Sequence, residues 1–337
     1  MANNIGVGAL GYIAYGKETT EGTFVTASKF LAANSFSFDD TNDYLSPMTI
    51  RGSRDMTLAL PAPFNVTGTM EMPFVPEDIE LLLKSAFSAS SVTTGVVGVT
   101  SAYSHVFTPG AISPTFTFEA YTGGSDGLTT DGLIRQYSGI RVNTLELRAS
   151  FGEIVTASVG LDGSDRRVKP LVSSALDPLT PSYASTSTSP FHFNGAKVQI
   201  AGSDSAIVKD VTFGINNNVQ HIGTLRQTRA YSRVASGARE LTLSMSMDFQ
   251  NTTDYQRLLD ETEFAVQLEF RGSLITGSTY NKLTVDLPRV KYRRVGVPIS
   301  AGEFITQDVE CTVLKPNSGD IATVTLVNGK SAAVAGI

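Results

Sequence analysis

The sequence lacks most of the side chains that carry covalent and metal chemistry. It contains no tryptophan, one cysteine, Cys311, and three histidines, His105, His192 and His221. A single cysteine cannot form a disulfide within the chain, which is typical of folding in a reducing compartment. The histidines follow no HxxH, HExxH or HxH spacing and have no cysteine beside them, so the sequence indicates no metal site.

Motifs of catalysis and nucleotide binding are missing too. The chain has neither a GxSxG nucleophile elbow nor a GxxxxGK[ST] phosphate loop. The glycine-rich TGGSDG at residues 122–127 has no basic residue directly after it and is typical of a turn. We therefore expect no catalytic residue, no cofactor and no bound metal, and a protein that is not an enzyme.

Long apolar runs and dense positive charge are also absent. No stretch approaches the roughly 20 apolar residues that a membrane-spanning helix needs, and MANNIGVGALGYIAYGKE has no pattern of a signal peptide. The net charge is -6, and basic residues gather only in short pairs such as Arg166-Arg167 and Arg293-Arg294. A tight DNA binder needs a cluster of Lys and Arg that displaces counterions from phosphate. We therefore expect that DNA, if it meets this protein, slides past it.

What the sequence does contain is an internal repeat. GEIVTASV at residues 152–159 matches GEFITQDV at residues 302–309, and NVTGTMEMPF at residues 65–74 matches ELTLSMSMDF at residues 240–249. The second pair alternates apolar and polar residues, which predicts strands with one wet face. The apolar positions are Val66, Met70, Met72 and Phe74, and Leu241, Met245, Met247 and Phe249; the polar positions are Thr67, Thr69 and Glu71, and Thr242, Ser244 and Ser246.

A short helix is predicted after each of these strands. The first is PEDIELLLKSAF at residues 76–87, where Pro76, Glu77 and Asp78 suit a helix start, and the second is TTDYQRLLDETEF at residues 252–264. Strands, one helix and further strands are thus used twice. We predict a mainly β fold of two tandem similar β-sandwich/partial-barrel domains, each with one short flanking α-helix. The first domain spans residues 1–175 and includes an N-terminal arm, and the second spans residues 195–337 and includes a C-terminal tail. A Ser-, Thr- and Pro-rich linker at 176–194 joins them.

A long polar connection precedes each of the two long strands. It spans residues 39–64 in the first half and 216–239 in the second. Such lengths are uncommon for plain hairpin loops and often mark functional loops, although a mobile surface loop is the alternative. Arg and Tyr are enriched at protein interfaces. The candidate contact residues are Tyr44, Arg51, Arg54, Asp55, Arg226, Arg229, Tyr231 and Arg233.

Several blocks of the chain resemble the phage tail tube (major tail) protein family, in its duplicated-domain type. They are GYIAYGKETTEGTF, HVFTPG, TFTFEAY and YSGIRVNTLELRASFGEIVTASVGLDG in the first half, and INNNVQHIGTLRQTRAYSRVASGARELTLSMSMDF in the second. The resemblance covers nearly the whole chain and is weakest in the linker and after Lys315. It implies domains whose sheets join between neighbours into a continuous inner barrel. Single-domain relatives form hexameric rings, so two fused copies imply trimers with six similar domains around an axis.

The resemblance also implies partners and a location. The rings would stack into a tube in the virion tail, assembled in the host cytoplasm, with the long connections between rings. Thr67, Thr69, Glu71, Thr242, Ser244 and Ser246 would line the channel, through which DNA passes without specific binding. Further partners would be the tape measure protein, the tail terminator and tail tip or baseplate proteins, with no membrane. The alternatives are a tube subunit of a contractile tail or injection machine, and a carbohydrate-binding or adhesin β-sandwich of the tail tip.

Overall fold

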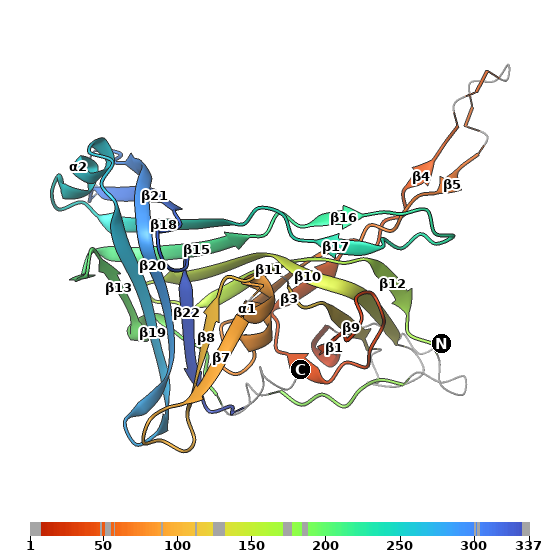
Figure 1. Cartoon of the computed structure of the whole chain (residues 1–337), viewed down its shortest axis with the longest axis horizontal. Coiled ribbons are helices and arrows are strands. Elements are labelled where there is room, and N and C mark those ends of the chain that lie inside the picture. The colour runs from red at the N-terminus through yellow and green to blue at the C-terminus, as the bar shows by residue number, and fades with distance from the viewer. Residues whose placement is uncertain are drawn as a thin grey trace.

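The protein is built mainly from antiparallel β-strands (Figure 1). This computed structural model describes residues 8–47, 49–50, 55–56, 58–88, 90–111, 113–123, 132–170, 177–183, 188–299, 301 and 304–331. Within these ranges there are two short α-helices, α1 (Glu80–Ala86) and α2 (Thr253–Leu259), and the 3-10 turns η1 (Gly8–Leu10) and η3 (Phe193–Gly195). The predicted mainly β fold with short helices is confirmed. Neither described helix is long and apolar enough to cross a membrane.

One large antiparallel sheet runs through both halves of the chain. Its order is β3 (Ser35–Phe38), β6 (Thr67–Pro73), β11 (Thr156–Asp162), β10 (Leu133–Ser150), β15 (Val208–Asn216), β18 (Glu240–Asp248), β21 (Thr306–Val313) and β20 (Thr279–Gly296). The pairing of β10 with β15 joins the two halves. The described pairings leave this sheet open rather than closed into a barrel.

The other strands extend β10 and β20 away from the large sheet. β9 (Phe116–Thr122), β1 (Tyr12–Lys17), β2 (Lys29–Leu31) and β12 (Asp165–Val168) lie around the beginning of β10. β19 (Phe264–Thr276), β13 (Ala196–Ile200), β14 (Ser203–Ser205) and β22 (Thr323–Asn328) lie around the beginning of β20. The hairpin of β7 (Ser90–Gly95) and β8 (Tyr103–Thr108) pairs with β22 and so ties the first half to the C-terminal strand.

Strand order and register correspond between the two halves. β3-β6-β11-β10 is the order in the first half, and β15-β18-β21-β20 is the order in the second. Met70 lies opposite Val159, and Met245 lies opposite Val309, as the two sequence repeats align them. Both long strands carry a register shift at the same place, between Val142 and Thr144 in β10 and between Tyr292 and Arg294 in β20. The division into two tandem domains with a linker at 176–194 stays a prediction.

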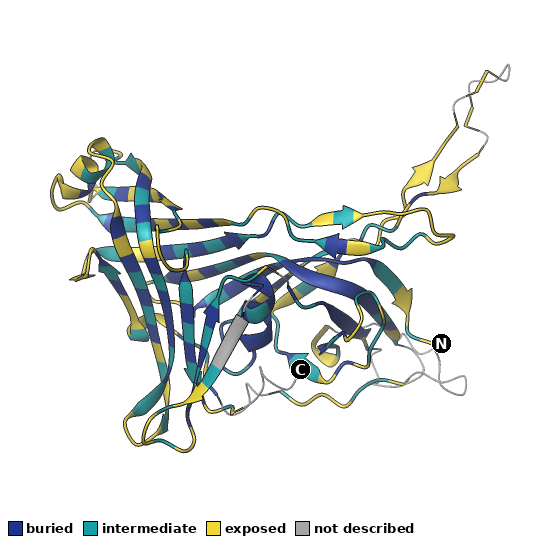
Figure 2. Cartoon of the chain, viewed as in Figure 1, coloured by how far each residue is buried: buried dark blue, intermediate teal, exposed yellow. Residues whose placement is uncertain are grey.

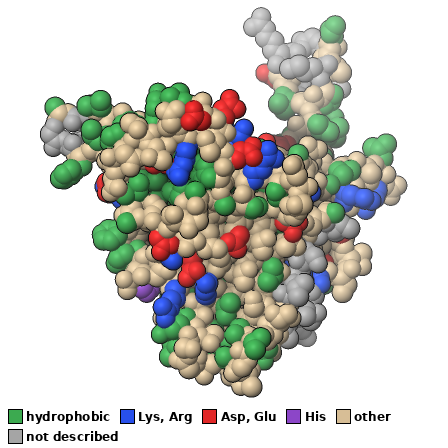
Figure 3. Space-filling model, turned by 60° about the vertical axis from the view of Figure 1, so that its left-hand side comes forward, with side chains coloured by type: hydrophobic (Ala, Val, Ile, Leu, Met, Phe, Trp, Pro, Cys, Tyr) green, Lys and Arg blue, Asp and Glu red, His purple; other side chains and the backbone are tan. Residues whose placement is uncertain are grey.

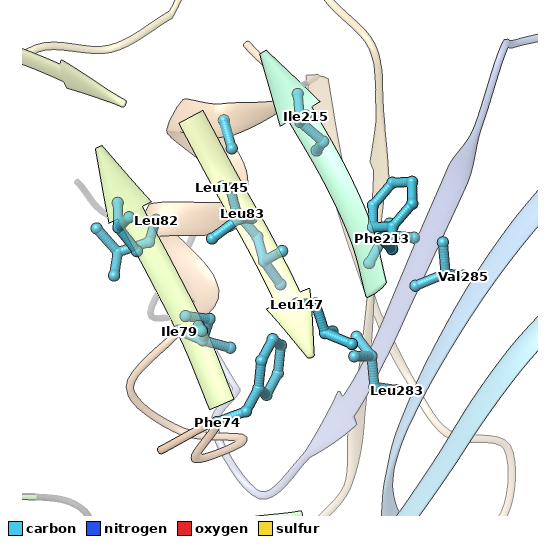
Figure 4. Packing of buried hydrophobic residues seen from close by; sticks show 14 of the residues in the cluster. Phe74, Ile79, Leu82, Leu83, Leu145, Leu147, Phe213, Ile215, Leu283 and Val285 are labelled. Atoms are coloured by element: carbon cyan, nitrogen blue, oxygen red, sulfur yellow. The ribbon is translucent and has the colours of Figure 1, made fainter. Parts of the chain in front are cut away.

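The predicted strand faces determine where the core lies (Figure 2). Val66, Met70, Met72 and Phe74 are fully buried, while Thr69 and Glu71 between them are exposed. Figure 4 shows residues of this core, where Ile79, Leu82 and Leu83 of the α1 segment face strands of both halves, among them β10 and β15. One apolar cluster therefore spans both halves, because β10 and β15 share a sheet.

Two details differ from the sequence-based expectation. Pro76, Glu77 and Asp78 form a turn before α1, which begins only at Glu80, so they do not make the first helical turn. Phe249 lies past the end of β18 and is 36% exposed, whereas its counterpart Phe74 is fully buried against Phe191, with ring centroids 5.7 Å apart. The alternation of apolar and polar residues predicts which face of a strand a residue lies on. It does not predict whether a segment distant in the sequence, such as the one with Phe191, covers that residue.

Candidate assembly surface

The described parts of both long connections form hairpins. The first arm, residues 39–66 between β3 and β6, contains β4 (Tyr44–Leu45) paired with β5 (Leu60–Pro61). The second arm, residues 217–239 between β15 and β18, contains β16 (Gln220–Ile222) paired with β17 (Arg233–Ala235). Figure 1 shows the first arm standing clear of the body, whereas the second arm runs along the edge of the body, both on the side away from α2. The described parts of the predicted long connections therefore form hairpin arms that leave corresponding strands of the two halves.

The first arm exposes apolar side chains. Tyr44 is 63% exposed, and the other exposed apolar residues of the arm are Leu45, Ile50, Met56, Leu58 and Leu60. Figure 3 shows this arm standing clear of the body with hydrophobic side chains on it. Asp55 is exposed as well, and Arg51 and Arg54 lie outside the described residues. Clustered apolar groups on a projecting element are typical of a surface that another protein covers.

Arg229 of the second arm holds the base of the first arm. Its Nε donates to the carbonyl oxygen of Ala62 at 2.6 Å and its Nη2 donates to Asn42 Oδ1 at 3.2 Å. The guanidinium also lies over the Phe64 ring, 4.4 Å from the centroid, and the Phe64 N–H donates to the Arg229 carbonyl at 3.1 Å. Arg166 adds bonds to the Thr41 carbonyl at 2.7 Å and to Asn42 Oδ1 at 2.9 Å. The two arms are thus fixed to each other within one chain.

The other predicted residues of the second arm divide into two groups. Tyr231 is half-buried, with its ring 4.7 Å from that of His221 and its N–H donating to the Ser164 carbonyl at 3.0 Å. Arg226 and Arg233 are exposed, and Arg226 Nη2 donates to the Tyr231 carbonyl at 3.1 Å. Arg229 and Tyr231 therefore position the arms, while Arg226 and Arg233 are available at the surface.

The predicted channel-lining residues lie on one polar face of the large sheet. Thr69, Glu71, Thr242 and Ser244 are exposed, and Thr67 and Ser246 are partly exposed. Glu71 lies directly opposite Ser158, and Ser246 lies opposite Asp308. The structure brings all six residues onto the same side, on strands β6 and β18.

Charged side chains that the sequence analysis did not single out share this polar face. Arg148 donates two hydrogen bonds to Glu146, at 3.1 and 3.0 Å, and Arg294 forms an ion pair with Glu310 at 2.9 Å. The acidic neighbours raise the pKa of Arg148, chiefly through the hydrogen bond and charge of Glu146. Arg148 and Arg294 are therefore each paired with a carboxylate. The alternation of Leu145 and Leu147 around Glu146 could have revealed that face of β10.

A buried polar cluster ties the C-terminal strand to the first half. His105 Nε2 lies 2.9 Å from Asn328 Oδ1, and Asn328 Nδ2 donates to the Pro76 carbonyl at 2.9 Å and to Glu80 Oε1. Burial raises the pKa of Glu80 to about 7 and lowers the pKa of His105. Within the described ranges no group of three or more His, Cys, Asp or Glu residues is placed to hold a metal ion. Buried Cys311 has its pKa raised to about 12 by desolvation, which makes its thiol unreactive.

Two comparisons with known proteins bear on this arrangement. A family model described as phage tail tube protein matches residues 8–313, which covers both arms and every strand of the large sheet. No curated protein matches the chain.

Proposed function

Since the chain belongs to the phage tail tube protein family and thus has a structural role in the tail of a virion, we propose that it forms the repeating ring of the tail tube. In this proposal three copies make one ring, each copy contributing two similar domains, and six domains surround a channel. Rings stack along the tail, and DNA leaves the particle through the channel. The proposal rests on the family together with the geometry of the large sheet.

The observation that carries the proposal is one sheet with a continuous polar face and two open ends. The eight strands from β3 to β20 present alternate residues to a wet side and bury the others under α1 and neighbouring segments. An open sheet edge is a hazard unless another strand covers it. Repetition of the same head-to-tail contact around an axis closes into a ring and covers both ends.

In the ring the polar face would surround the channel. Thr67, Thr69, Glu71, Thr242, Ser244 and Ser246 would line it, together with the paired charges of β10 and β20. Duplex DNA carries one negative charge per roughly 1.7 Å of its axis and binds to clustered positive charge. Arg148 and Arg294 on this wall are already paired with carboxylates, which supports passage of DNA without binding.

The arms would make the contacts between stacked rings. The exposed apolar residues of the first arm, with Tyr44 and Asp55, and the exposed Arg226 and Arg233 of the second arm support this role. Arg51 and Arg54 are assigned to the same contact from the sequence alone. Tape measure protein, tail terminator and tail tip or baseplate proteins would complete the tail during assembly in the host cytoplasm.

Electron microscopy of the purified protein, combined with mass measurement of single rings, tests this proposal. We expect rings or tubes with a central channel and three chains per ring. Six chains per ring would contradict the trimer but keep the tube. Compact particles that form neither rings nor tubes under any assembly condition, including addition of tail tips, would contradict the proposed function.

A further inference from the structure

The junction between the two halves of the chain defines how one copy meets the next. We propose that β3 of a second copy adds to the chain at the end of β20, with Ser37 of that copy opposite Pro298, which lies two residues past Gly296, the last residue of β20. This inference rests on the proposed ring and names its partner surface residue by residue. The two open ends of the sheet are the segments involved, and the occupant is another copy of this chain.

The internal junction is a long antiparallel pairing between β10 and β15. Leu147 lies opposite Phe213 on the buried side, and Arg148 lies opposite Thr212 on the polar side. At the two ends of this pairing, the Asn217 N–H donates to the Asn143 carbonyl at 2.8 Å and the Phe151 N–H donates to the Lys209 carbonyl at 3.0 Å.

Register identifies the corresponding strands at the open ends. β3 pairs with β6 as β15 pairs with β18, because Ser37 lies opposite Thr69 and Thr212 lies opposite Ser244. β20 pairs with β21 as β10 pairs with β11, because Leu145 lies opposite Val159 and Val295 lies opposite Val309.

These correspondences place Ser37 where Thr212 stands, and continuing the register of β20 two residues past Gly296 places Pro298 where Arg148 stands. Transferring the observed pair of Arg148 and Thr212 to the open ends yields the proposed pair of Pro298 and Ser37. The same register places Phe38 opposite Val297 and Phe36 opposite Ile299 on the apolar side. A slip of one residue would set apolar groups against the polar face, which disfavours the neighbouring registers.

Both edges are available in the described chain. β3 has β6 on one side only, and the end of β20 has β21 on one side only, among the described strands. The Asp39 N–H donates to the Thr67 carbonyl at 2.8 Å, so odd-numbered residues of β3 direct their amides toward β6. Residues alternate between the two neighbours of a strand. The backbone groups of Phe36 and Phe38 therefore face the open edge.

Proline at position 298 is compatible with this pairing. In the internal junction the backbone hydrogen bonds join opposite residues that both have odd numbers, such as Asn217 and Asn143. The pair of Arg148 and Thr212 lies between two such hydrogen-bonded pairs. A pair between the bonded pairs exchanges no hydrogen bond across the junction. Pro298 takes the place of Arg148, so the N–H that proline lacks is not needed there.

The side chain of Asn42 is positioned to make, with a second copy, the hydrogen bonds that Asn217 makes across the internal junction. Asn217 Oδ1 accepts from Arg239 Nε at 3.2 Å, while its Nδ2 donates to the carbonyls of Ala86 at 2.8 Å and Val142 at 3.0 Å. These carbonyls belong to the first half, so Asn217 ties the second arm across the junction.

Asn42 stands at the corresponding place in the first arm, and Arg166 and Arg229 likewise bind its Oδ1. With the oxygen held in this way, the two Nδ2 hydrogens are the donors left to face a neighbour. The carbonyls that correspond to those of Ala86 and Val142 are those of Leu259 and Tyr292 in another copy.

The helix ends support this correspondence. The Phe87 N–H donates to the Leu83 carbonyl and the Asp260 N–H donates to the Gln256 carbonyl, both at 2.9 Å. The residues that follow, Ser88 and Glu261, both adopt a left-handed backbone, with φ of 51° and 50°. Ala86 therefore corresponds to Leu259.

The corresponding faces of the two helices differ in exposure. Leu82 and Ala86 of α1 are fully buried, whereas Tyr255 and Leu259 of α2 are 46% and 60% exposed. Exposed apolar groups on α2 therefore flank the edge where a second copy would bind. Continuity with the internal junction identifies that copy as the occupant.

Cysteine cross-linking tests the register. Cα atoms in a pair that lies between the backbone bonds are about 4.5 Å apart, within the range of a disulfide, whereas diagonal neighbours are about 7–8 Å apart. We expect assembled Ser37→Cys/Pro298→Cys protein to form dimers and trimers linked by disulfides after mild oxidation. The matched control, Ser37→Cys/Gly296→Cys, shares the strands and face but is two residues out of register. It should cross-link several-fold less.

Residue-resolved hydrogen exchange of the unmodified protein provides a second test that needs no variant. The amides of Phe36 and Phe38 should gain protection on assembly, whereas those of Ser37 and Asp39 should be protected already in the free subunit. Equal cross-linking of the two cysteine pairs, or unchanged exchange at Phe36 and Phe38 within rings, would overturn this register. Failure of the unmodified protein to form rings would instead contradict the proposed function.

Discussion

Arg229 donates a hydrogen bond to the carbonyl oxygen of Ala62 and thereby joins two arms that lie far apart in the sequence, with 2.6 Å between Nε and the oxygen. The same guanidinium bonds Asn42 and covers Phe64. Both contacts lie where the first arm leaves the body, so Arg229 determines the direction in which that arm projects. A residue type that is enriched at interfaces here acts within one chain.

Replacing Arg229 with Ala should loosen the first arm. The variant loses two side-chain hydrogen bonds and a cation–π contact, and we expect the free energy of unfolding to fall by about 1–2 kcal/mol. Limited proteolysis should cut the first arm faster than in the unmodified subunit. Arg226→Ala, which removes an exposed arginine from the same arm, is the control and should change the unfolding free energy by less than about 0.5 kcal/mol. Equal cleavage of the two variants would show that Arg229 does not hold the arm.

Removing the exposed arginines of the second arm should affect stacking rather than folding. Arg226→Ala with Arg233→Ala should leave the melting temperature of the subunit nearly unchanged, because exposed charges contribute little to stability. Tubes should become short or rare, since an interface arginine can contribute strongly to binding. Adding Arg229→Ala to this pair should lower stability as well, since Arg229 has contacts inside the chain.

The matched control for the double variant is Lys197→Ala with Lys315→Ala, which removes two exposed basic residues outside the arms. Tube lengths measured by electron microscopy and melting curves of the free subunits separate the two effects. Full-length tubes from the Arg226→Ala/Arg233→Ala protein would exclude these side chains from the contact between rings.

The buried carboxyl of Glu80 should make the subunit less stable as the pH rises. Burial raises its pKa from 4.5 to about 7, so the folded protein keeps a proton that the unfolded chain has released. The stabilisation is complete below about pH 4.5 and is lost as the pH rises through about 7. Its size is on the order of 3 kcal/mol. Glu80→Gln keeps an oxygen for Asn328 and should remove this loss.

Urea denaturation of the free subunit at pH 5 and pH 7.5 measures the effect of Glu80. The raised pKa of Asp78 and the lowered pKa of His105 affect the stability of both proteins. The difference between the unmodified protein and Glu80→Gln in how far the unfolding free energy falls from pH 5 to pH 7.5 therefore isolates Glu80. Glu153→Gln, which removes an exposed carboxyl, is the control. An identical fall in stability in the unmodified and Glu80→Gln proteins would contradict the assignment.

The sequence determined the faces of the strands better than the contacts of single side chains. Met70 and Met72 are buried and Glu71 is exposed because a two-residue period is a local property of a strand. The position of Phe249 depends on a covering segment, and Ala62, Asn42 and Phe64, the partners of Arg229, lie more than a hundred residues away in the chain. No local pattern contains such information. The burial of Glu80 has the same kind of cause, since its partner Asn328 lies far away in the sequence.

The last prediction concerns the polar face and the channel. Glu71 is exposed on β6 between buried Met70 and Met72, with Thr69 on the same side. If this face surrounds the channel, Glu71→Lys places a new ring of positive charge on the wall at every level of the tube. Assembly should continue, because Glu71 points away from the core. Passing DNA should be slowed, and more strongly at low salt, because the attraction of phosphate to lysine weakens as counterions compete.

DNA ejection from particles that carry Glu71→Lys, measured over a range of salt concentrations, tests this expectation. Asp320→Lys makes the same change in charge on an exposed loop outside the large sheet and is the matched control. A lumen position predicts slow ejection for Glu71→Lys alone, with recovery as salt rises, because screening acts over about 10 Å at 0.1 M ionic strength. An exterior position predicts normal ejection for both variants. Normal rates for Glu71→Lys at every salt concentration would therefore place Glu71 away from the channel wall and turn the polar face of β6 outward.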